Sequence, residues 1–346
     1  MADSVRITEV GPGQARQWDD FVAGHPAAST YHAWHWRDLV SREFGCDTCY
    51  FAATDASGTW RGVLPLVRLR SYLFGDFLVS LPFFNYGGAL AADAVVEDAL
   101  MGAAVDLARR LGVQHVEFRD QAPRSGWPVR TDKVAMLLNL APTVDEQWSA
   151  LGSKLRAQIR RPEKEGAVTR FGGADLVADF YRVFARNMRD LGTPVYARSL
   201  FTRIARQMPD QARIAVVYIR NEPVAAGFTL RHGDCLEIPW ASSLRDWNRV
   251  GVNMQLYWAV LKDAIERGVC QFDFGRSTVD AGTYRFKAQW GAKPRQLYWH
   301  YWLPEGRELP GLSPNNPRYA KAIQLWQKLP VWVANLIGPR IVRRLP

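Results

Sequence analysis

The residues with the clearest capacity for chemistry lie in one stretch, FDFGRSTVDAGTYRFKAQWG, between Phe272 and Gly291. Lys287 supplies a cation that can stabilise a negatively charged oxygen or a phosphate group. Asp273 can orient an amine or accept its proton, although a structural ion pair with Arg276 would use the same carboxylate. We expect Lys287, Asp273 and Arg276 to be the catalytic residues of this chain.

The run QFDFG is typical of a strand that carries this aspartate. Alternation along a strand places Phe272 and Phe274 on one side and Asp273 on the other. Gly275 is expected to end the strand and to open a cleft, because ligands bind at the strand ends of open α/β sheets. Ser277 follows at this cleft and is a candidate substrate-binding residue.

A helix is expected to begin after Gly282 and to bring the lysine to this cleft. Tyr284 and Lys287 are three residues apart and share one face of it, whereas Phe286 and Trp290 lie on another. Tyr284 and Phe286 are candidate substrate-binding residues. The alternative is that the lysine is exposed on an aromatic helix and has no catalytic role.

A glycine turn leads into a longer predicted helix in the segment WNRVGVNMQLYWAVLKDAIERG. Backbone N–H groups at such a junction can hold a pyrophosphate. Acetyltransferases of the GNAT type carry R-x-x-G-x-G/A there, whereas this chain offers Arg249, Gly251 and Asn253 and lacks the second glycine. Asn253 and Tyr257, four residues apart, are candidate substrate-binding residues facing the same cleft.

A basic ridge is predicted on a further helix within residues 151–173. Arg156, Arg160 and Lys164 recur every four residues and share a face, beside an apolar stripe of Leu151, Leu155 and Ile159. Pro162 is expected to kink or end this helix. The ridge is a candidate phosphate- or RNA-binding surface, and a solvated basic face is the alternative.

Composition indicates a globular protein with anionic partners. The 346 residues carry a formal net charge of +10, which suits tRNA, nucleotide diphosphates, coenzyme A or anionic lipid without choosing among them. His32 and His35 have no evident third ligand, so no metal is expected. No cofactor is expected besides the donor co-substrate. Serine-hydrolase, zinc-protease, phosphate-loop and dinucleotide-binding motifs are absent from the sequence.

Two segments repeat each other and predict an α/β fold with mixed sheets made by duplication. Ala108–Asp120 and Ala264–Arg276 align with Gly112 on Gly268 and with Glu117 on Asp273. Each reads as a helix end, a glycine stop and a strand. Strand pairs with turns at Asp55–Gly58 and Asn221–Pro223 precede them. We therefore expect domains at residues 1–142 and 143–308, followed by a basic tail at residues 309–346.

The tail and the N-terminus bear on location. No acidic residue follows Glu308, and the tail combines Trp326 and Trp332 with aliphatic and basic residues. Such a segment can lie in a membrane interface, or it can pack across the other domain. The N-terminus has no signal-peptide pattern and no apolar run could span a bilayer. We expect a cytoplasmic protein, with peripheral contact to the inner membrane as one alternative.

The segment NMQLYWAVLKDAIERGVCQFDFGRSTVDAGTYRFKAQWGAKPRQLYWHYWL resembles the C-terminal half of FemAB-type proteins, in the branch associated with PEP-CTERM/exosortase and exopolysaccharide systems. GVLPLVRLRSYLFGDFLVSLPFFNYGG and LPVWVANLIGPRIVRRLP are similar to that branch as well. Val252 stands where the branch usually has proline. The resemblance implies two GNAT-like domains in tandem. It also implies transfer of an aminoacyl group from aminoacyl-tRNA to an amine of a cell-envelope precursor.

The resemblance also assigns residues. Phe286 and Lys287 match the F-K-x-x-[FW]-G run, in which the lysine is important at the acceptor–donor channel. Trp34 and Arg37 correspond to a tryptophan and a basic residue that contacts the phosphates of the precursor, with arginine in place of the usual lysine.

The expected function is N-acyl transfer, with aminoacyl-tRNA as the donor co-substrate and a cell-envelope or exopolysaccharide precursor as the acceptor. Such a reaction needs a positioned amine and a stabilised oxyanion but no covalent enzyme intermediate. An acyl-CoA-dependent GNAT N-acyltransferase is the enzymatic alternative. A non-catalytic RNA- or lipid-binding adaptor of the same fold is the alternative from another class.

Overall fold

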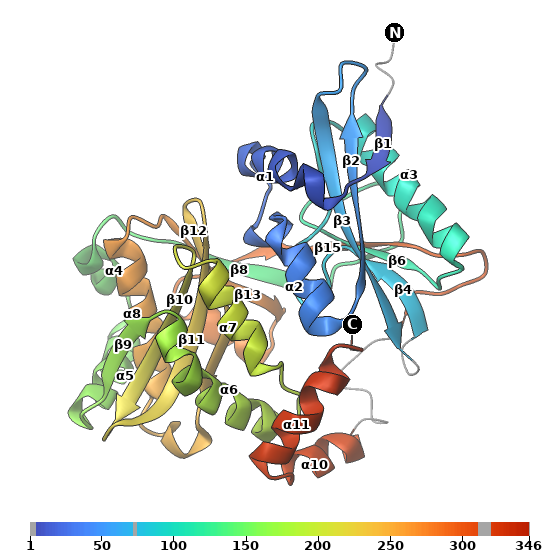
Figure 1. Ribbon diagram of the computed structural model, residues 1–346. Coiled ribbons are helices and arrows are strands. Elements are labelled where there is room, and N and C mark those ends of the chain that lie inside the picture. Colours follow the sequence, from blue (N-terminus) through green and yellow to red (C-terminus); the bar gives the residue numbers. More distant parts are fainter. Residues whose placement is uncertain (1–4, 72–74, 311–319, 346) are drawn as a thin grey trace. The chain divides into compact units, whose positions relative to one another are not determined.

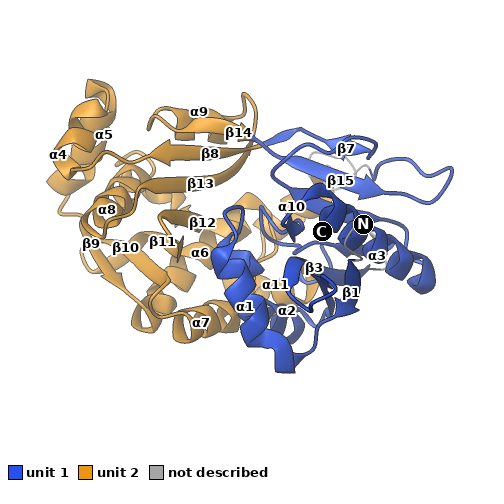
Figure 2. Ribbon diagram, turned by 90° about the horizontal axis from the view of Figure 1, so that it is seen from above, with its two compact units in different colours: residues 1–133, 296–311, 343–346 blue, residues 134–295, 312–342 orange. Residues whose placement is uncertain are grey.

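A computed structural model describes residues 5–71, 75–310 and 320–345 of the chain (Figure 1). Part of the predicted basic tail, residues 311–319 and 346, lies outside the described residues. The chain forms two compact units (Figure 2). The first comprises residues 1–133, 296–311 and 343–346, and the second comprises residues 134–295 and 312–342.

The first unit is a mixed sheet with helices on both faces. Its strands follow the order β1-β2-β3-β4-β6-β15-β7, with β5 paired to β3. They are β1 (Arg6–Glu9), β2 (Asp47–Thr54), β3 (Trp60–Ser71), β4 (Gly75–Val79), β5 (Leu90–Ala91), β6 (Val116–Asp120), β7 (Val129–Arg130) and β15 (Tyr298–Trp302). The helices are α1 (Ala15–Gly24), α2 (His35–Phe44) and α3 (Ala94–Leu111).

The second unit repeats this architecture. Its strands follow the order β14-β8-β13-β12-β11-β10-β9. They are β8 (Lys133–Asn139), β9 (Val168–Gly172), β10 (Ala212–Ile219), β11 (Glu222–His232), β12 (Cys235–Ser243), β13 (Gln271–Thr278) and β14 (Lys293–Gln296). The helices are α4 (Val144–Ala150), α5 (Ser153–Lys164), α6 (Val177–Leu191), α7 (Arg198–Gln207), α8 (Val252–Glu266), α9 (Gly282–Ala288), α10 (Ala320–Gln327) and α11 (Val331–Val342).

Side chains of the second sheet pack against helices on both of its faces. Ala215 and Val217 join a core that includes Leu256 and Val260 of α8. On α6 and α7, aromatic side chains gather around Phe228 of β11 and Trp240 of β12: Phe180, Phe184 and Phe201. A strand that is apolar on both faces is buried between two layers, because its side chains point alternately up and down.

The predicted duplication is confirmed at the positions from which it was inferred. Gly112 ends α3 and Gly268 follows α8, both in the left-handed conformation that glycine adopts without strain. The next strand then pairs in parallel, β6 with β4 and β13 with β12. Glu117 and Asp273 occupy the same place in the two units. The fold is therefore a mixed α/β architecture made of two units of similar topology.

The two units exchange their last strands. β15 follows the second unit in the sequence but pairs with β6 of the first, whereas β8 follows the first unit but lies between β14 and β13 in the second sheet. The compact units thus divide the chain differently from the predicted segments 1–142, 143–308 and 309–346. Those boundaries stay a prediction, because compactness and duplication are different criteria.

One local prediction is wrong. Gly275 does not end its strand, since β13 continues to Thr278 and the glycine has a φ of 75° within it. A single left-handed residue redirects a strand without ending it. Pro162, which was expected to kink or end its helix, lies near the end of α5, whose last residue is Lys164. The helix ends within one turn after this proline. Proline has no backbone N–H, so one helical hydrogen bond is lost there. No described helix is both long and apolar enough to cross a membrane.

Candidate functional site

The candidate site begins where β12 and β13 separate. The parallel pairing joins Cys235–Glu237 to Gln271–Asp273, and both strands continue beyond it, β12 to Ser243 and β13 to Thr278. The last paired residues are Glu237 and Asp273. Two neighbouring strands whose pairing ends within the sheet leave backbone groups available to a third partner at the point of separation.

Two buried carboxylates and one buried ammonium meet at this point. Glu237 and Asp273 are 5% and 3% exposed, and Lys287 of α9 is 8% exposed. Lys287 Nζ donates hydrogen bonds to the carbonyl oxygens of Gly275 (3.0 Å) and Arg276 (2.9 Å). The Gly275 N–H in turn donates to Asp273 Oδ1 at 2.7 Å. The left-handed conformation of Gly275 thus turns its carbonyl to the lysine and its N–H to the aspartate.

Burial lowers the pKa of Lys287 from its ordinary 10.5 to about 8. Asp273 and Glu237 oppose this shift by attracting the charged form, and Arg276 adds to it by repulsion. The amine therefore holds a proton near neutral pH but releases it more readily than an exposed lysine. An ammonium has three N–H donors, and the described residues accept two of them, so one can meet a substrate oxygen.

An aromatic wall flanks the lysine. Tyr257 of α8 stacks on Phe274 at 5.5 Å between ring centroids and meets Phe286 edge-on at 5.0 Å. Trp290 closes the group at 6.1 Å from Tyr257. Burial raises the pKa of the Tyr257 hydroxyl, so this group stays protonated. Tyr284 is half-buried against the apolar core of the second unit, and the shared helix face with Lys287 stays a prediction.

The remaining residues of the stretch differ in exposure. Ser277 is 4% exposed, and its Oγ has no hydrogen-bond partner within the described part of the chain. Buried hydroxyls in native proteins are almost always paired, so an unpaired one beside a candidate site points to a substrate or water. Arg276 is exposed and contributes its backbone carbonyl to Lys287. The site therefore collects Lys287, Asp273 and Ser277.

Glu237 was missed by the sequence analysis. It lies in the run LEI, an acid between two aliphatic residues. The same apolar–acid–apolar pattern occurs in VEF at residues 116–118 and in FDF at residues 272–274, where it did attract notice. This pattern was the available signal, because an acid in an otherwise apolar strand is rarely buried without a partner.

The equivalent point in the first unit is filled by its own side chains. Val79 stands opposite Glu117 in the parallel pairing, where the second unit has Glu237. Arg119 Nε donates to Glu117 Oε1 at 2.7 Å, and the Tyr301 hydroxyl donates to Oε2 at 2.8 Å. Arg119 lowers the pKa of the Glu117 carboxyl against the opposing effect of burial. Both carboxylate oxygens of Glu117 are therefore bonded within the first unit, so the second unit is the better candidate for catalysis.

The predicted basic ridge lies on α5, and the predicted apolar stripe is buried, although Leu151 precedes α5, which begins at Ser153. Arg160 and Lys164 are exposed, and Arg160 covers the ring of Trp148 at 5.1 Å. Arg156 is half-buried and donates to the Ser149 carbonyl at 3.4 Å. The ridge is thus available to a polyanion, and a phosphate role for it stays a prediction.

The N-terminus of α8 packs against this same helix α5. A Cβ at Gly251, whose φ is 87°, would lie 3.3 Å from the Gln158 carbonyl oxygen. In a regular helix the N–H of residue 162 would donate to this carbonyl four residues earlier, but Pro162 has no N–H. Asn253 is half-buried in the first turn of α8, on the helix that also carries Tyr257.

Arg37 and Trp34 belong to the first unit. The Arg37 guanidinium lies over the Trp34 ring at 4.9 Å and forms an ion pair with Asp38 at 3.9 Å. Trp34 is buried, and its backbone N–H donates to Asp19 Oδ1 at 2.7 Å. The pair is a packed cation–π contact, and its predicted role in holding a precursor stays a prediction.

Within the described residues, no three histidine, cysteine or acidic side chains lie close enough together to hold a metal ion. His32 is buried and bonds the Ser29 hydroxyl and the Gly88 carbonyl, which makes it a packing residue. The arrangement around Lys287 can position an amine, accept its proton and stabilise a developing oxyanion. These are the operations that acyl transfer to nitrogen requires.

Comparison with known proteins supports this chemistry. The model of the family described as an acetyltransferase (GNAT) domain matches residues 151–288, which include Glu237, Asp273 and Lys287. No curated protein matches the chain.

Solved structures share the fold at low sequence identity. The crystal structure of FemX is 12% identical, covering 85% of this chain and 96% of that chain at a TM-score of 0.65. The structure of L-PGS from Bacillus licheniformis is 13% identical, covering 95% and 98% at a TM-score of 0.58. A tandem GNAT protein from the clavulanic acid biosynthesis pathway is 13% identical, covering 88% and 100% at a TM-score of 0.52. The protein is therefore an acyltransferase with two GNAT-like folds in tandem, the second of which carries the matched acetyltransferase-type domain.

Proposed function

We propose that the protein is a Fem-like N-acyltransferase that moves an aminoacyl group to an amine of a cell-envelope or exopolysaccharide precursor. The observation that carries the proposal is the Lys287 ammonium, held by two backbone carbonyls beside Glu237 and Asp273. The structural likeness to FemX and to L-PGS supports aminoacyl transfer as the subclass. The PEP-CTERM-associated branch is the part of this proposal that rests on sequence resemblance.

The proposed reaction is direct transfer. The acceptor amine attacks the carbonyl carbon of the donor ester, and the new C–N bond creates a tetrahedral oxyanion that the Lys287 ammonium stabilises. The proton leaves the attacking nitrogen for Asp273 or Glu237. The C–O bond to the ribose oxygen of the donor then breaks, and that oxygen receives a proton. The sum is one proton moved from the amine to the alcohol, with no covalent enzyme intermediate.

We take aminoacyl-tRNA as the donor, and acyl-CoA is the competing candidate. The exposed Arg160 and Lys164 on α5 favour a long polyanion, because guanidinium and ammonium groups bind backbone phosphates. The loop before α8 has one glycine and packs on Gln158, which leaves fewer backbone N–H groups open to a pyrophosphate than a two-glycine loop. The acetyltransferase family match is the observation that favours coenzyme A.

Donor binding should separate these two candidates. A charged tRNA is expected to bind at least about tenfold more tightly than acetyl-CoA at the same ionic strength, because the ridge adds several phosphate contacts. Isothermal titration with each donor measures this ratio. An Arg160→Gln/Lys164→Gln variant should lose affinity for tRNA, whereas an exposed control, Arg109→Gln/Arg110→Gln, should keep it. Tight acetyl-CoA binding with no tRNA binding would replace the aminoacyl assignment with acyl-CoA chemistry.

The pH dependence of kcat/KM should reveal the protonation state of Lys287. Its pKa of about 8 means that the ammonium predominates at pH 7 and is lost as the pH rises through 8. If the charged form stabilises the oxyanion, kcat/KM is expected to fall above pH 8. A Lys287→Arg variant, if active, should not show this fall, because arginine keeps its proton. A wild-type profile that rises through pH 8 while the Lys287→Arg profile does not would make the neutral amine the active form and would exclude the ammonium role.

A further inference from the structure

The last two helices, α10 and α11, have an inner side that is fixed to the second unit. Both pack against α6 of that unit. Trp326 is buried on α10, and Ala334, Gly338 and Val342 are buried at intervals of four residues along α11. A Cβ at Gly338 would lie 2.9 Å from the backbone nitrogen of Val195, so the glycine lets α11 approach closely. This packing uses one side of each helix.

The outer side of the same helices carries large apolar side chains that water reaches. Trp332 of α11 is 70% exposed, and Leu325, Leu336 and Ile341 are exposed as well. Four of the ten large apolar side chains that are exposed in the described part of the chain therefore lie within residues 325–341. Single exposed apolar residues are ordinary, whereas a group of them marks a surface that binds a partner.

Basic residues accompany these apolar side chains on each helix. On α10 and its end, exposed lysines stand four residues before Leu325 and three residues after it. On α11, exposed residues recur every four positions from Trp332 through Leu336 to an arginine. Residues at these spacings share one side of a helix. We call these two sides the outer faces, and their members are Lys321, Leu325, Lys328, Trp332, Leu336 and Arg340.

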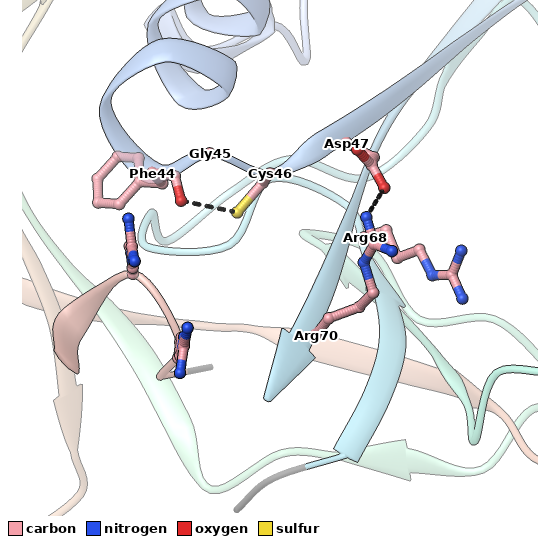
Figure 3. A pocket seen from close by; sticks show the side chains of 8 residues that line it. Phe44, Gly45, Cys46, Asp47, Arg68 and Arg70 are labelled. Carbon is pink, nitrogen blue, oxygen red and sulfur yellow. Dashed lines mark hydrogen bonds and ion pairs between the residues drawn. The ribbon is translucent and has the colours of Figure 1, made fainter. Parts of the chain in front are cut away.

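The arginines that follow α11 do not belong to the outer faces. Arg343 and Arg344 line a hollow of the first unit, beside the start of β2 and the end of β3. Figure 3 shows this hollow, in which Arg70 pairs with Asp47. The positive charge of the outer faces therefore does not depend on these two arginines.

The outer faces combine apolar area with positive charge, and no Asp or Glu follows Glu308 in the sequence. Two copies of such a surface repel each other, because like charges would meet across the contact. An anionic partner that also accepts apolar side chains complements them. The surface of a bilayer with anionic lipid offers both properties, since headgroups attract Lys and Arg while the acyl boundary takes up aliphatic side chains.

We propose that the outer faces of α10 and α11 bind the surface of a membrane that contains anionic lipid. Trp332 suits this place, because a tryptophan ring is largely apolar and carries one polar N–H, and such rings gather at the membrane–water boundary. Packing on α6 and contact with a membrane are compatible, because they use opposite sides of the helices. The proposal goes beyond acyl transfer, since residues 320–342 lie outside the region matched by the acetyltransferase family.

Flotation with vesicles tests the apolar part of the outer faces. The full chain is expected to float with vesicles of equimolar phosphatidylglycerol and phosphatidylcholine, and not with phosphatidylcholine alone. A Trp332→Ser/Leu336→Ser variant should bind at least about tenfold more weakly, because two apolar side chains no longer leave water. The matched control is Val95→Ser/Val168→Ser, which removes two exposed apolar side chains elsewhere and should bind as the wild type does.

The same assay tests the charges. A Lys321→Gln/Lys328→Gln/Arg340→Gln variant should also bind at least about tenfold more weakly, since each basic residue near an anionic surface adds to the affinity. Binding of the wild type should weaken as salt rises, because salt screens this attraction.

The charge control and the opposing outcomes complete the test. Arg42→Gln/Arg110→Gln/Arg206→Gln removes the same charge from exposed arginines outside the outer faces and should bind as the wild type does. Thermal unfolding verifies that every variant keeps its fold. No flotation of the wild type, equal flotation with phosphatidylcholine alone, or equal losses in variants and controls would overturn the proposal. A dimer that Trp332→Ser/Leu336→Ser dissociates, without any flotation, would assign the outer faces to a contact between copies instead.

Discussion

A Lys287→Met variant is expected to lose about 10²–10³-fold in kcat/KM for acyl transfer, the usual effect of removing one donor to an oxyanion. The lysine is the group whose charge can reach a developing oxyanion at the separation of β12 and β13. Methionine keeps most of the length and apolar volume of the side chain but offers no proton and no charge. Initial rates with the donor identified by titration measure the effect.

The matched control is Arg285→Met, which removes an exposed cation from the same helix α9 and should leave the rate unchanged. Loss of Lys287 also leaves Glu237 and Asp273 without a nearby ammonium, so thermal unfolding must accompany the kinetics. If the variant is too unstable to assay, Lys287→Met/Asp273→Asn is compared with Asp273→Asn alone, so that both proteins lack this carboxylate and differ only in the lysine. A folded variant with full activity would show that this lysine is structural and would remove the catalytic assignment.

An Arg119→Met variant is expected to lose about 3–5 kcal/mol in the free energy of unfolding, the typical cost of stranding a buried charge. Glu117 and Arg119 are both 3% exposed, so water cannot replace the lost partner. The guanidinium also donates to the Phe84 carbonyl and lies over the Trp299 ring at 4.4 Å. Denaturant unfolding with tryptophan fluorescence measures the difference.

Two comparisons make this result specific. Arg61→Met breaks the exposed pair with Asp93, which should cost at most about 1 kcal/mol. Glu117→Gln/Arg119→Met removes both charges and should recover much of the loss, because no uncompensated carboxylate remains. A small effect of Arg119→Met alone would mean that Glu117 is protonated or hydrated, and the first unit would then offer an open carboxylate of its own.

Local patterns sufficed for much of the fold. The glycine stops at Gly112 and Gly268, and the apolar–acid–apolar strands after them, repeat because each half needs the same helix end and the same buried strand. The buried stripe of α5 follows from helical period alone. Lys287 was singled out by residue type and resemblance, and its expected place on a helix with Tyr284 agrees with α9.

Long-range pairing had to be seen in three dimensions. The exchange of β15 and β8 between the sheets brings Tyr301 opposite Glu117, and no local signal marks which sheet a strand joins. The same is true of Glu237. Its place in the candidate site follows from its pairing opposite Asp273, which no local pattern predicts. Arg343 and Arg70 are a further example, because they line one pocket of the first unit although they lie far apart in the sequence.

The stretch from Phe272 to Gly291 separates what the sequence determines from what only the tertiary structure determines. Residue types alone marked a cation and a carboxylate suited to acyl transfer, since their chemistry does not depend on the fold. Their environment does depend on it. Burial of Lys287 between the carbonyls of Gly275 and Arg276, which lowers its pKa to about 8, arises from the left-handed Gly275 within a continuing strand and from the return of α9 onto that strand. A pKa is set by solvent exclusion and by neighbouring charges, and both are properties of packing.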